Sequence, residues 1–141
     1  ALAIPVTWRW KIIADPSVNL TPSFHWPVPV MAEDIEEDRG PVMVTVEYQI
    51  DPVNREAFQT AMEEFGHTRR RDGAFSWGIF EDVSEPGRYL EYFLVESWLE
   101  HERQHHRVTE ADQAAEQKVM QYHLGETRPV ARHLIAPKPP S

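Results

Sequence analysis

Residues 42–50 read VMVTVEYQI, and this stretch decides the fold. Its even-numbered positions are all apolar, and its odd-numbered positions are mostly polar. Alternation with a period of two indicates a β-strand with one buried face, because successive side chains of a strand point to opposite sides. Asp51-Pro52 ends the strand, since proline cannot donate a hydrogen bond to a neighbouring strand.

A helix and a hairpin are predicted next. Residues 54–71, NREAFQTAMEEFGHTRRR, have an apolar stripe at helical spacing. The stripe consists of Ala57, Phe58, Ala61, Met62 and Phe65. Gly73 closes this unit. Residues 74–83 and 88–97 predict two strands joined by a turn at Glu85-Pro86-Gly87.

Two capping signals divide the following residues into two helices. Ser97 precedes a helix predicted over 98–107, and Thr109 precedes a helix predicted over 110–123, each with an acidic residue three positions later. The second helix is expected to bury Val108, Ala111, Ala115, Val119 and Tyr122.

Residues 128–136 predict a last strand, which completes the order β-α-β-β-α-β. This order is typical of the ferredoxin-like arrangement, an α+β fold with an antiparallel sheet.

Composition limits the classes of function. The chain has 141 residues, a formal net charge of −9 and no cysteine. A nucleic-acid surface is not expected, because such a surface needs clustered positive charge. The lack of cysteine excludes disulfides, thiolate metal sites and a cysteine nucleophile.

The chain divides into three parts. Residues 1–40 predict a juxtamembrane stub followed by a proline-rich, acidic linker or arm. Residues 41–137 predict the folded domain, and residues 138–141 a short tail, because domain boundaries fall in proline-rich and charged stretches. The stub begins ALAIPVTWRWK, and an apolar run followed by Trp, Arg and Lys is typical of the cytoplasmic end of a membrane helix. A surface strand or packing arm is the alternative.

The strand at 88–97 is apolar on both faces. Phe93 and Val95 lie on one face, and Leu90, Tyr92 and Leu94 lie on the other. Helices in this fold cover only one face of the sheet, so the second face would expose an apolar surface. A second copy packed on that face would cover it, and we therefore expect a symmetric homodimer.

A zinc-protease pattern occurs at residues 101–105, HERQH. In such enzymes two His at i and i+4 bind zinc and the Glu acts as general base. One zinc protease class has a Gly three residues and a His six residues after the second His, but Val108 and Ala111 occupy those positions here. We therefore expect no metal site and rank a zinc hydrolase last.

The same helix predicts a pocket. Trp98, His101 and His105 share one face, at i, i+3 and i+7. This face is either a polar and aromatic edge of the core, with hydrogen-bonded neutral imidazoles, or the wall of a small pocket for a flat aromatic ligand. Tyr92 and Trp77 are further candidates for lining the pocket, depending on the sheet face that each occupies.

The remaining histidines and the arginine run are given structural roles. His67, His106, His123 and His133 show no ligand spacing and are interpreted as surface or interface residues. Arg69, Arg70 and Arg71 end a predicted helix, where positive charge suits the helix dipole. No carboxyl pair is isolated in an apolar run, so no catalytic residue is predicted.

The chain resembles two known families. The element order, with Trp98 after the third strand and a His on the next helix, resembles the antibiotic-biosynthesis monooxygenase family, a dimeric α+β barrel. Three stretches together resemble the C-terminal soluble part of bacterial major facilitator transporters of the transmembrane secretion effector type. These stretches are NLTPSFHWPVPV, RRRDGAFSWGIFED and VESWLEHERQHHRVTEAD. In that group the helix reads Trp-x-x-His-x-Arg-x-His, so Glu102 is incidental to the His spacing.

The resemblance implies a function. The domain would lie at the cytoplasmic face of the inner membrane as part of an exporter, would be soluble when isolated, and would serve dimerisation or sensing of a small aromatic ligand without a cofactor. A cofactor-independent monooxygenase is the alternative. Haem-degrading relatives use an Asn on the first strand together with a Trp and a His; here the first strand, VMVTVEYQI, has no Asn. Haem chemistry is therefore not expected.

Overall fold

The computed structural model describes residues 34–140. The predictions for the stub and for residues 12–33 lie outside the described residues. The elements are β3 (Val42–Gln49), the 3-10 turn η2 (Pro52–Asn54), α2 (Arg55–Arg71), β4 (Ser76–Glu81), β5 (Arg88–Val95), α3 (Trp98–His106), α4 (Glu110–Met120) and β6 (Val130–Ile135). The predicted α+β, ferredoxin-like order is confirmed, with α3 as a separate short helix before α4.

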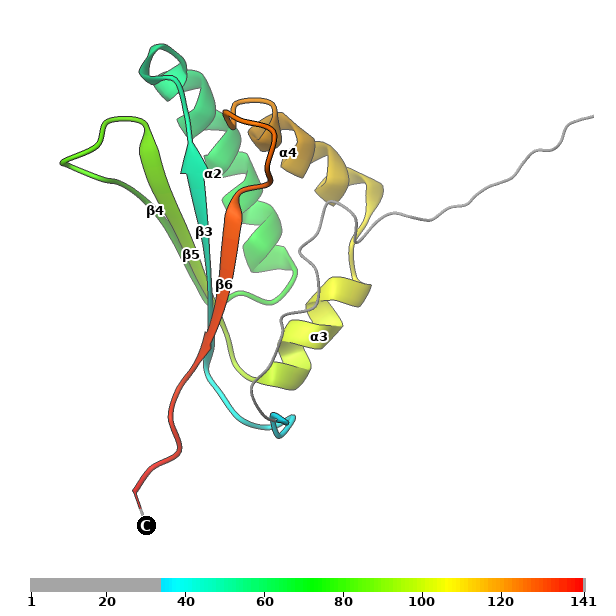
Figure 1. Ribbon diagram of the computed structural model, residues 1–141. Coiled ribbons are helices and arrows are strands. Elements are labelled where there is room, and N and C mark those ends of the chain that lie inside the picture. The colour runs from blue at the N-terminus through cyan, green and yellow to red at the C-terminus, as the bar shows by residue number, and fades with distance from the viewer. Residues whose placement is uncertain (1–33, 141) are drawn as a thin grey trace, which may run out of the picture.

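The strands form one antiparallel sheet in the order β4-β5-β3-β6. β3 lies between β5 and β6, and its Val44 is opposite Phe93 on one side and His133 on the other. The α-helices lie on one side of this sheet, as Figure 1 shows. The core fills the space between them and the sheet, and α2 contributes Phe58, Met62 and Phe65 to it.

The alternation in β3 has the predicted effect. Val42, Val44, Val46 and Tyr48 have no exposed surface and point toward the helices. The intervening side chains point to the opposite face, which the described helices leave uncovered. The two faces of β5 also divide as predicted, with Phe93 and Val95 buried and Leu90 partly exposed.

Gly87 allows the turn between β4 and β5. Its φ angle is +92°, in the left-handed region that glycine adopts without strain. A Cβ atom built at this position would lie 2.3 Å from the carbonyl oxygen of Ile50. The turn can therefore approach the end of β3 closely, and the Ile50 N–H donates to the Gly87 carbonyl at 2.8 Å.

Two predicted core positions are wrong. Ala57 of α2 and Ala111 of α4 are exposed. In α4 the buried face contains two acidic residues, Asp112 and Glu116, in addition to Ala115 and Val119. Asp112 is the N3 residue of the capping box, and its carboxylate turns back to the backbone at the start of the helix. The buried face of α4 therefore includes Asp112 in place of Ala111.

Both capping signals are present. The Thr109 side chain accepts a hydrogen bond from the Asp112 N–H at 3.1 Å, and the Asp112 carboxylate accepts one from the Thr109 N–H at 3.0 Å. The Ser97 hydroxyl accepts a hydrogen bond from the Glu100 N–H at 3.1 Å. The two helices therefore begin where the sequence predicts.

We expect Thr109→Ala to lower the free energy of unfolding by about 1–2 kcal/mol, because the side-chain acceptor at the start of α4 is lost. Thr60→Ala is the matched control, since the Thr60 hydroxyl is exposed and only donates to the Glu56 carbonyl within α2. Urea denaturation followed by circular dichroism measures both. Equal stabilities of the two variants would contradict the capping role.

Over the range 34–140, no helix is both long and apolar enough to cross a membrane.

Candidate functional site

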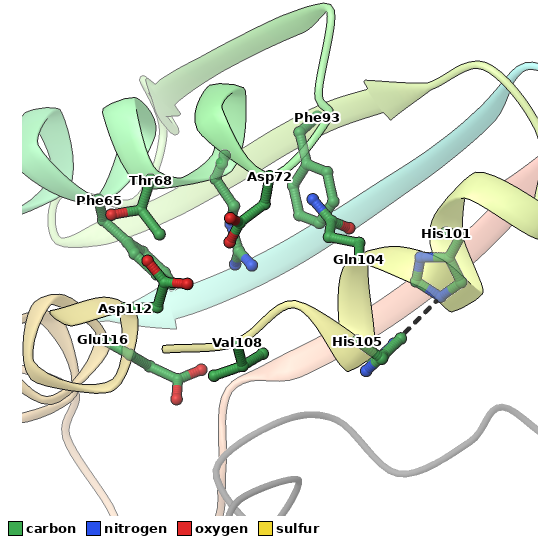
Figure 2. Close-up of a pocket in the computed structure, with 11 residues that line it drawn as sticks. Phe65, Thr68, Asp72, Phe93, His101, Gln104, His105, Val108, Asp112 and Glu116 are labelled. Carbon is green, nitrogen blue, oxygen red and sulfur yellow. Dashed lines mark hydrogen bonds between the residues drawn. The ribbon is translucent and has the colours of Figure 1, made fainter. Parts of the chain in front are cut away.

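A small cavity lies between α2, α3, α4 and β5 (Figure 2). Its lining residues are Phe65, Thr68, Arg69, Asp72, Phe93, His101, Gln104, His105, Val108, Asp112 and Glu116. We call it the histidine cavity. Its volume of about 40 Å³ is enough for a few water molecules. Benzene binds in a dry cavity of roughly 150 Å³, so an aromatic ring does not fit the histidine cavity in this conformation.

The histidines of α3 meet at one wall. The Nε2 atoms of His101 and His105 are 3.3 Å apart, so one ring donates a hydrogen bond to the other. The Trp98 ring lies against His101, with ring centroids 5.2 Å apart. The predicted clustering of these three side chains on one helix face is therefore present. His101 and His105 line the cavity, while Trp98 supports His101 from outside it.

His133 of β6 joins this group, which the sequence analysis missed. Its ring centroid is 4.9 Å from that of His101 and 6.4 Å from that of Trp98. The interpretation of His133 as a surface or interface residue is wrong, because it shares the helix-facing side of β6 with Ala131 and Ile135. The alternation along β6 could have predicted this, because His133 is two residues from both Ala131 and Ile135 and so lies on the same face.

Burial keeps these imidazoles neutral. It lowers the pKa of His101 to about 3 and that of His133 to about 4, with the neighbouring imidazoles adding to the effect. The pKa of His105 is also lowered, first by burial and then by Arg69. Near pH 7 each ring therefore offers one donor and one acceptor and no charge.

Some polar atoms near the cavity lack a hydrogen-bond partner among residues 34–140. They are Nδ1 of His101, Nε2 of Gln104 and Nε2 of His133. His101 is 3 % exposed and Gln104 is 8 % exposed. A buried polar group without a partner costs about 1–3 kcal/mol, so α3 presents polar groups that would gain from a bound molecule.

The opposite wall contains carboxyl groups from α2 and α4. Burial raises the pKa of Glu116 to about 8, although Arg69 opposes the shift. Burial and the neighbouring Asp112 raise the pKa of Asp72 to about 6. Asp112 forms an ion pair with Arg71 at 2.5 Å. In Figure 2 these carboxyl groups lie across the cavity from the imidazoles of α3.

Arg69 lines the histidine cavity, and its side chain is largely buried. It donates two hydrogen bonds to Glu91, at 2.9 and 3.1 Å, and lies between the rings of Phe65 and Phe93. The Glu91 side chain has no exposed surface. Arg69 lies in the last turn of α2, as predicted, but its assigned role as a cation that complements the helix dipole is wrong, because its guanidinium turns inward to pair with the Glu91 carboxylate on β5.

Two neutral donors complete the surroundings of Glu91. The Tyr48 hydroxyl donates to it at 3.0 Å and the Trp77 Nε1–H at 2.9 Å. Burial and the charge of Glu91 raise the pKa of Tyr48 well above its ordinary value, so its hydroxyl keeps its proton. Trp77 thus lies on the helix side of the sheet but binds Glu91 and does not line the cavity.

Tyr92 lies on the other face of the sheet. Its ring stacks on Phe80, with centroids 5.9 Å apart, and its hydroxyl is 3.2 Å from that of Ser76. Tyr92 is therefore separated from the histidine cavity by the sheet, because it has the same parity along β5 as Leu90 and Leu94. Its inclusion among the pocket residues is corrected accordingly.

A family profile described as transmembrane secretion effector matches residues 1–140. The chain belongs to the transmembrane secretion effector family. A search of curated proteins found no match.

Solved structures show which fold this member of the family shares. A candidate antibiotic biosynthesis monooxygenase from Caulobacter crescentus CB15 is similar with a TM-score of 0.60 and 19% identity, over 72% of this chain and 94% of that one. A second candidate antibiotic biosynthesis monooxygenase, from Bordetella bronchiseptica, has a TM-score of 0.59 and 14% identity, over 71% of this chain and 100% of that one. The Mycobacterium tuberculosis protein Rv0793 has a TM-score of 0.56 and 16% identity, over 72% and 100%. At these identities the likeness shows the fold alone.

In this transmembrane secretion effector chain, the zinc-protease pattern of residues 101–105 lies on α3. The described part of the chain has no group of three or more His, Cys, Asp or Glu side chains placed to hold a metal ion. The rings of His101, His105 and His133 pack edge to face. Glu102 is exposed, away from the buried face of α3.

Proposed function

We propose that this domain pairs two copies of the chain through the sheet face that lies opposite the helices, as a non-catalytic accessory domain of a major-facilitator-type exporter at the cytoplasmic face of the inner membrane. The observation that supports pairing is the apolar character of this surface, which we call the open face. Its apolar members are Met43, Phe80, Leu90, Tyr92, Leu94, Val130 and Leu134. Phe80, Leu90, Val130 and Leu134 are between 38 and 60 % exposed.

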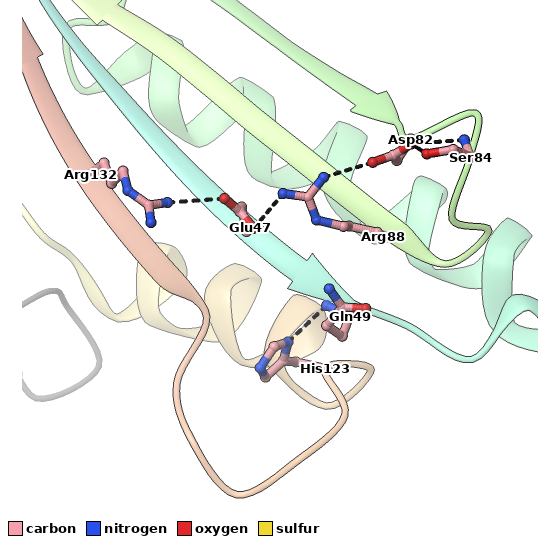
Figure 3. A network of polar contacts seen from close by, with 7 residues as sticks. All are labelled: Glu47, Gln49, Asp82, Ser84, Arg88, His123 and Arg132. Carbon is pink, nitrogen blue, oxygen red and sulfur yellow. Dashed lines mark hydrogen bonds and ion pairs between the residues drawn. The ribbon is translucent and has the colours of Figure 1, made fainter.

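A second copy is the occupant that suits the charges of this face. Glu47, which lies between Leu90 and Val130 on the open face, is bonded to Arg88 at 2.9 Å and to Arg132 at 3.0 Å (Figure 3). Arg88 in turn contacts Asp82 at 2.7 Å. The charges are therefore balanced within one copy, and two copies can approach without repulsion despite the net charge of −9. A symmetric pair also places the same apolar residues on both sides of the contact.

The test is the association state of the whole chain. We expect sedimentation equilibrium to give a dimer, and the double variant Leu90→Arg/Leu134→Arg to raise the dimer dissociation constant by roughly 100-fold or more. Each unpaired charge would be buried twice in a symmetric contact. Circular dichroism establishes that the variant is folded, since both positions are partly exposed.

Val53→Arg/Val83→Arg is the matched control. It makes the same chemical change at residues that are 83 and 101 % exposed and lie outside the sheet. We expect this control to remain dimeric. A wild-type chain that stays monomeric, or a Leu90→Arg/Leu134→Arg variant that pairs as well as the control, would overturn the proposal.

The histidine cavity supports a second candidate function, sensing of a small ligand. The unpartnered buried atoms of His101 and Gln104 favour this role, since a ligand could satisfy them. The present volume holds only water-sized molecules, so an aromatic ligand would enter only after α3 moves away from the sheet.

A further inference from the structure

The first turn of α3 is capped by the chain that precedes the sheet. A helix begins with N–H groups that have no partner within the helix. At the start of α3 the Trp98 N–H donates to the Arg39 carbonyl at 2.8 Å, and the Leu99 N–H donates to the Glu37 carbonyl at 2.9 Å. Residues 35–41, which we call the strap, therefore provide backbone acceptors that helices otherwise take from side chains or water.

The strap is fixed against the domain at further points. Ile35 packs against the core, and the Arg39 guanidinium donates to the Ala136 carbonyl at 3.0 Å. Gly40 lies so close to the segment that leads into α3 that a Cβ built on it would be 2.0 Å from the Glu96 carbonyl oxygen. Only a glycine allows this approach, so the strap and the start of α3 fit each other closely.

α3 buries fewer large apolar side chains than α2 does, so its position depends more on the attachment to the strap. Its buried residues are Trp98, His101 and Gln104, two of which are polar, whereas α2 buries several large apolar side chains. A helix with few buried apolar contacts opens locally at low free-energy cost. The inner face of α3 is also one wall of the histidine cavity, so displacement of α3 would widen that cavity.

We propose that the strap is a conformational device that sets the position of α3 and so keeps His101 buried in the wall of the histidine cavity. The strap is also where the described domain joins residues 1–33. A force on the chain that lifts the strap removes two hydrogen bonds from the first turn of α3 and exposes His101. The device goes beyond pairing through the open face, because α3 and the strap contact the helix side of the sheet and the end of β6.

Carbethoxylation by diethyl pyrocarbonate, measured residue by residue with mass spectrometry, tests the device. The reagent modifies accessible neutral imidazoles, and His101 is 3 % exposed while His67 and His106 are exposed. We expect Gly40→Ala to increase the modification rate of His101 about tenfold, because the strap must shift away from Glu96 and the bonds to Trp98 and Leu99 weaken. The rates at His67 and His106 should not change.

Glu37→Ala is the matched control, since it keeps the backbone carbonyl that caps Leu99, and we expect wild-type rates from it. Amide hydrogen exchange of β3 and β5 shows whether Gly40→Ala is folded. If it is not, Arg39→Ala replaces it, because this variant removes the hydrogen bond to the Ala136 carbonyl and keeps the backbone carbonyl that caps Trp98. A folded strap variant with wild-type modification of His101 and wild-type exchange at the Trp98 and Leu99 amides would overturn the proposal. The outcome does not depend on whether the chain forms dimers.

Discussion

We expect Arg69→Met to lower the free energy of unfolding by about 3–5 kcal/mol, the largest loss among the substitutions considered. The substitution leaves the Glu91 carboxylate without its cation in a position with no exposed surface. Breaking a buried ion pair from one side costs this much, because the remaining charge has lost water and gained no substitute. Urea denaturation at pH 7 measures the change.

Two further variants separate the charge from the packing. Arg70→Met is the control, because Arg70 is exposed, and it should change stability by less than about 1 kcal/mol. Arg69→Met/Glu91→Gln should recover at least half of the loss, since an amide oxygen can still accept from Tyr48 and Trp77 without carrying charge. A loss below about 1 kcal/mol for Arg69→Met would contradict a stabilising buried ion pair between Arg69 and Glu91.

Glu116→Gln is expected to stabilise the protein in a way that depends on pH. Burial raises the pKa of this carboxyl from 4.5 to about 8, so the folded protein keeps a proton that the unfolded chain loses above pH 4.5. Between these two values the folded state binds more protons, and wild-type stability falls as pH rises. The amide of the variant does not titrate and escapes this loss.

The difference in stability between the two proteins should therefore grow with pH. A shift of this size corresponds to roughly 5 kcal/mol at most, and we expect about 2–3 kcal/mol in favour of the variant at pH 8 and less than about 0.5 kcal/mol at pH 4. Wild type, Glu116→Gln and the exposed control Glu63→Gln are compared by urea denaturation across this range. The buried histidines titrate in all three proteins and cancel. A difference independent of pH would contradict a protonated Glu116.

Local sequence patterns predicted the elements of the fold well. The alternation in residues 42–50 placed four side chains of β3 in the core, and the capping signals at Ser97 and Thr109 separated α3 from α4. These features depend on residues close together in the chain, where strand and helix periods act directly. The strand pairing and the single-sided placement of the helices followed from the element order.

The candidate site was predicted only where a local period determined it. Trp98, His101 and His105 lie together because they share one face of α3. Glu91 and His133 were missed, although their parity along β5 and β6 places both on the helix side. A polar residue on the buried side of a strand needs a hydrogen-bond or charge partner, and the sequence alone does not show that partner. The partner of Glu91 is Arg69, which lies on α2, distant in sequence.

The position of β6 in the sheet has a consequence for synthesis of the protein. β3 begins the sheet and pairs along one edge with β6, its last strand, with Val42 opposite Ile135. While the ribosome makes the intervening residues, that edge of β3 has no strand to join. Such sheets of distant strands close slowly, and the unpaired edge meanwhile can bind another strand. The sheet is thus completed only after β6 has been translated, and until then chaperones have access to the unpaired edge of β3.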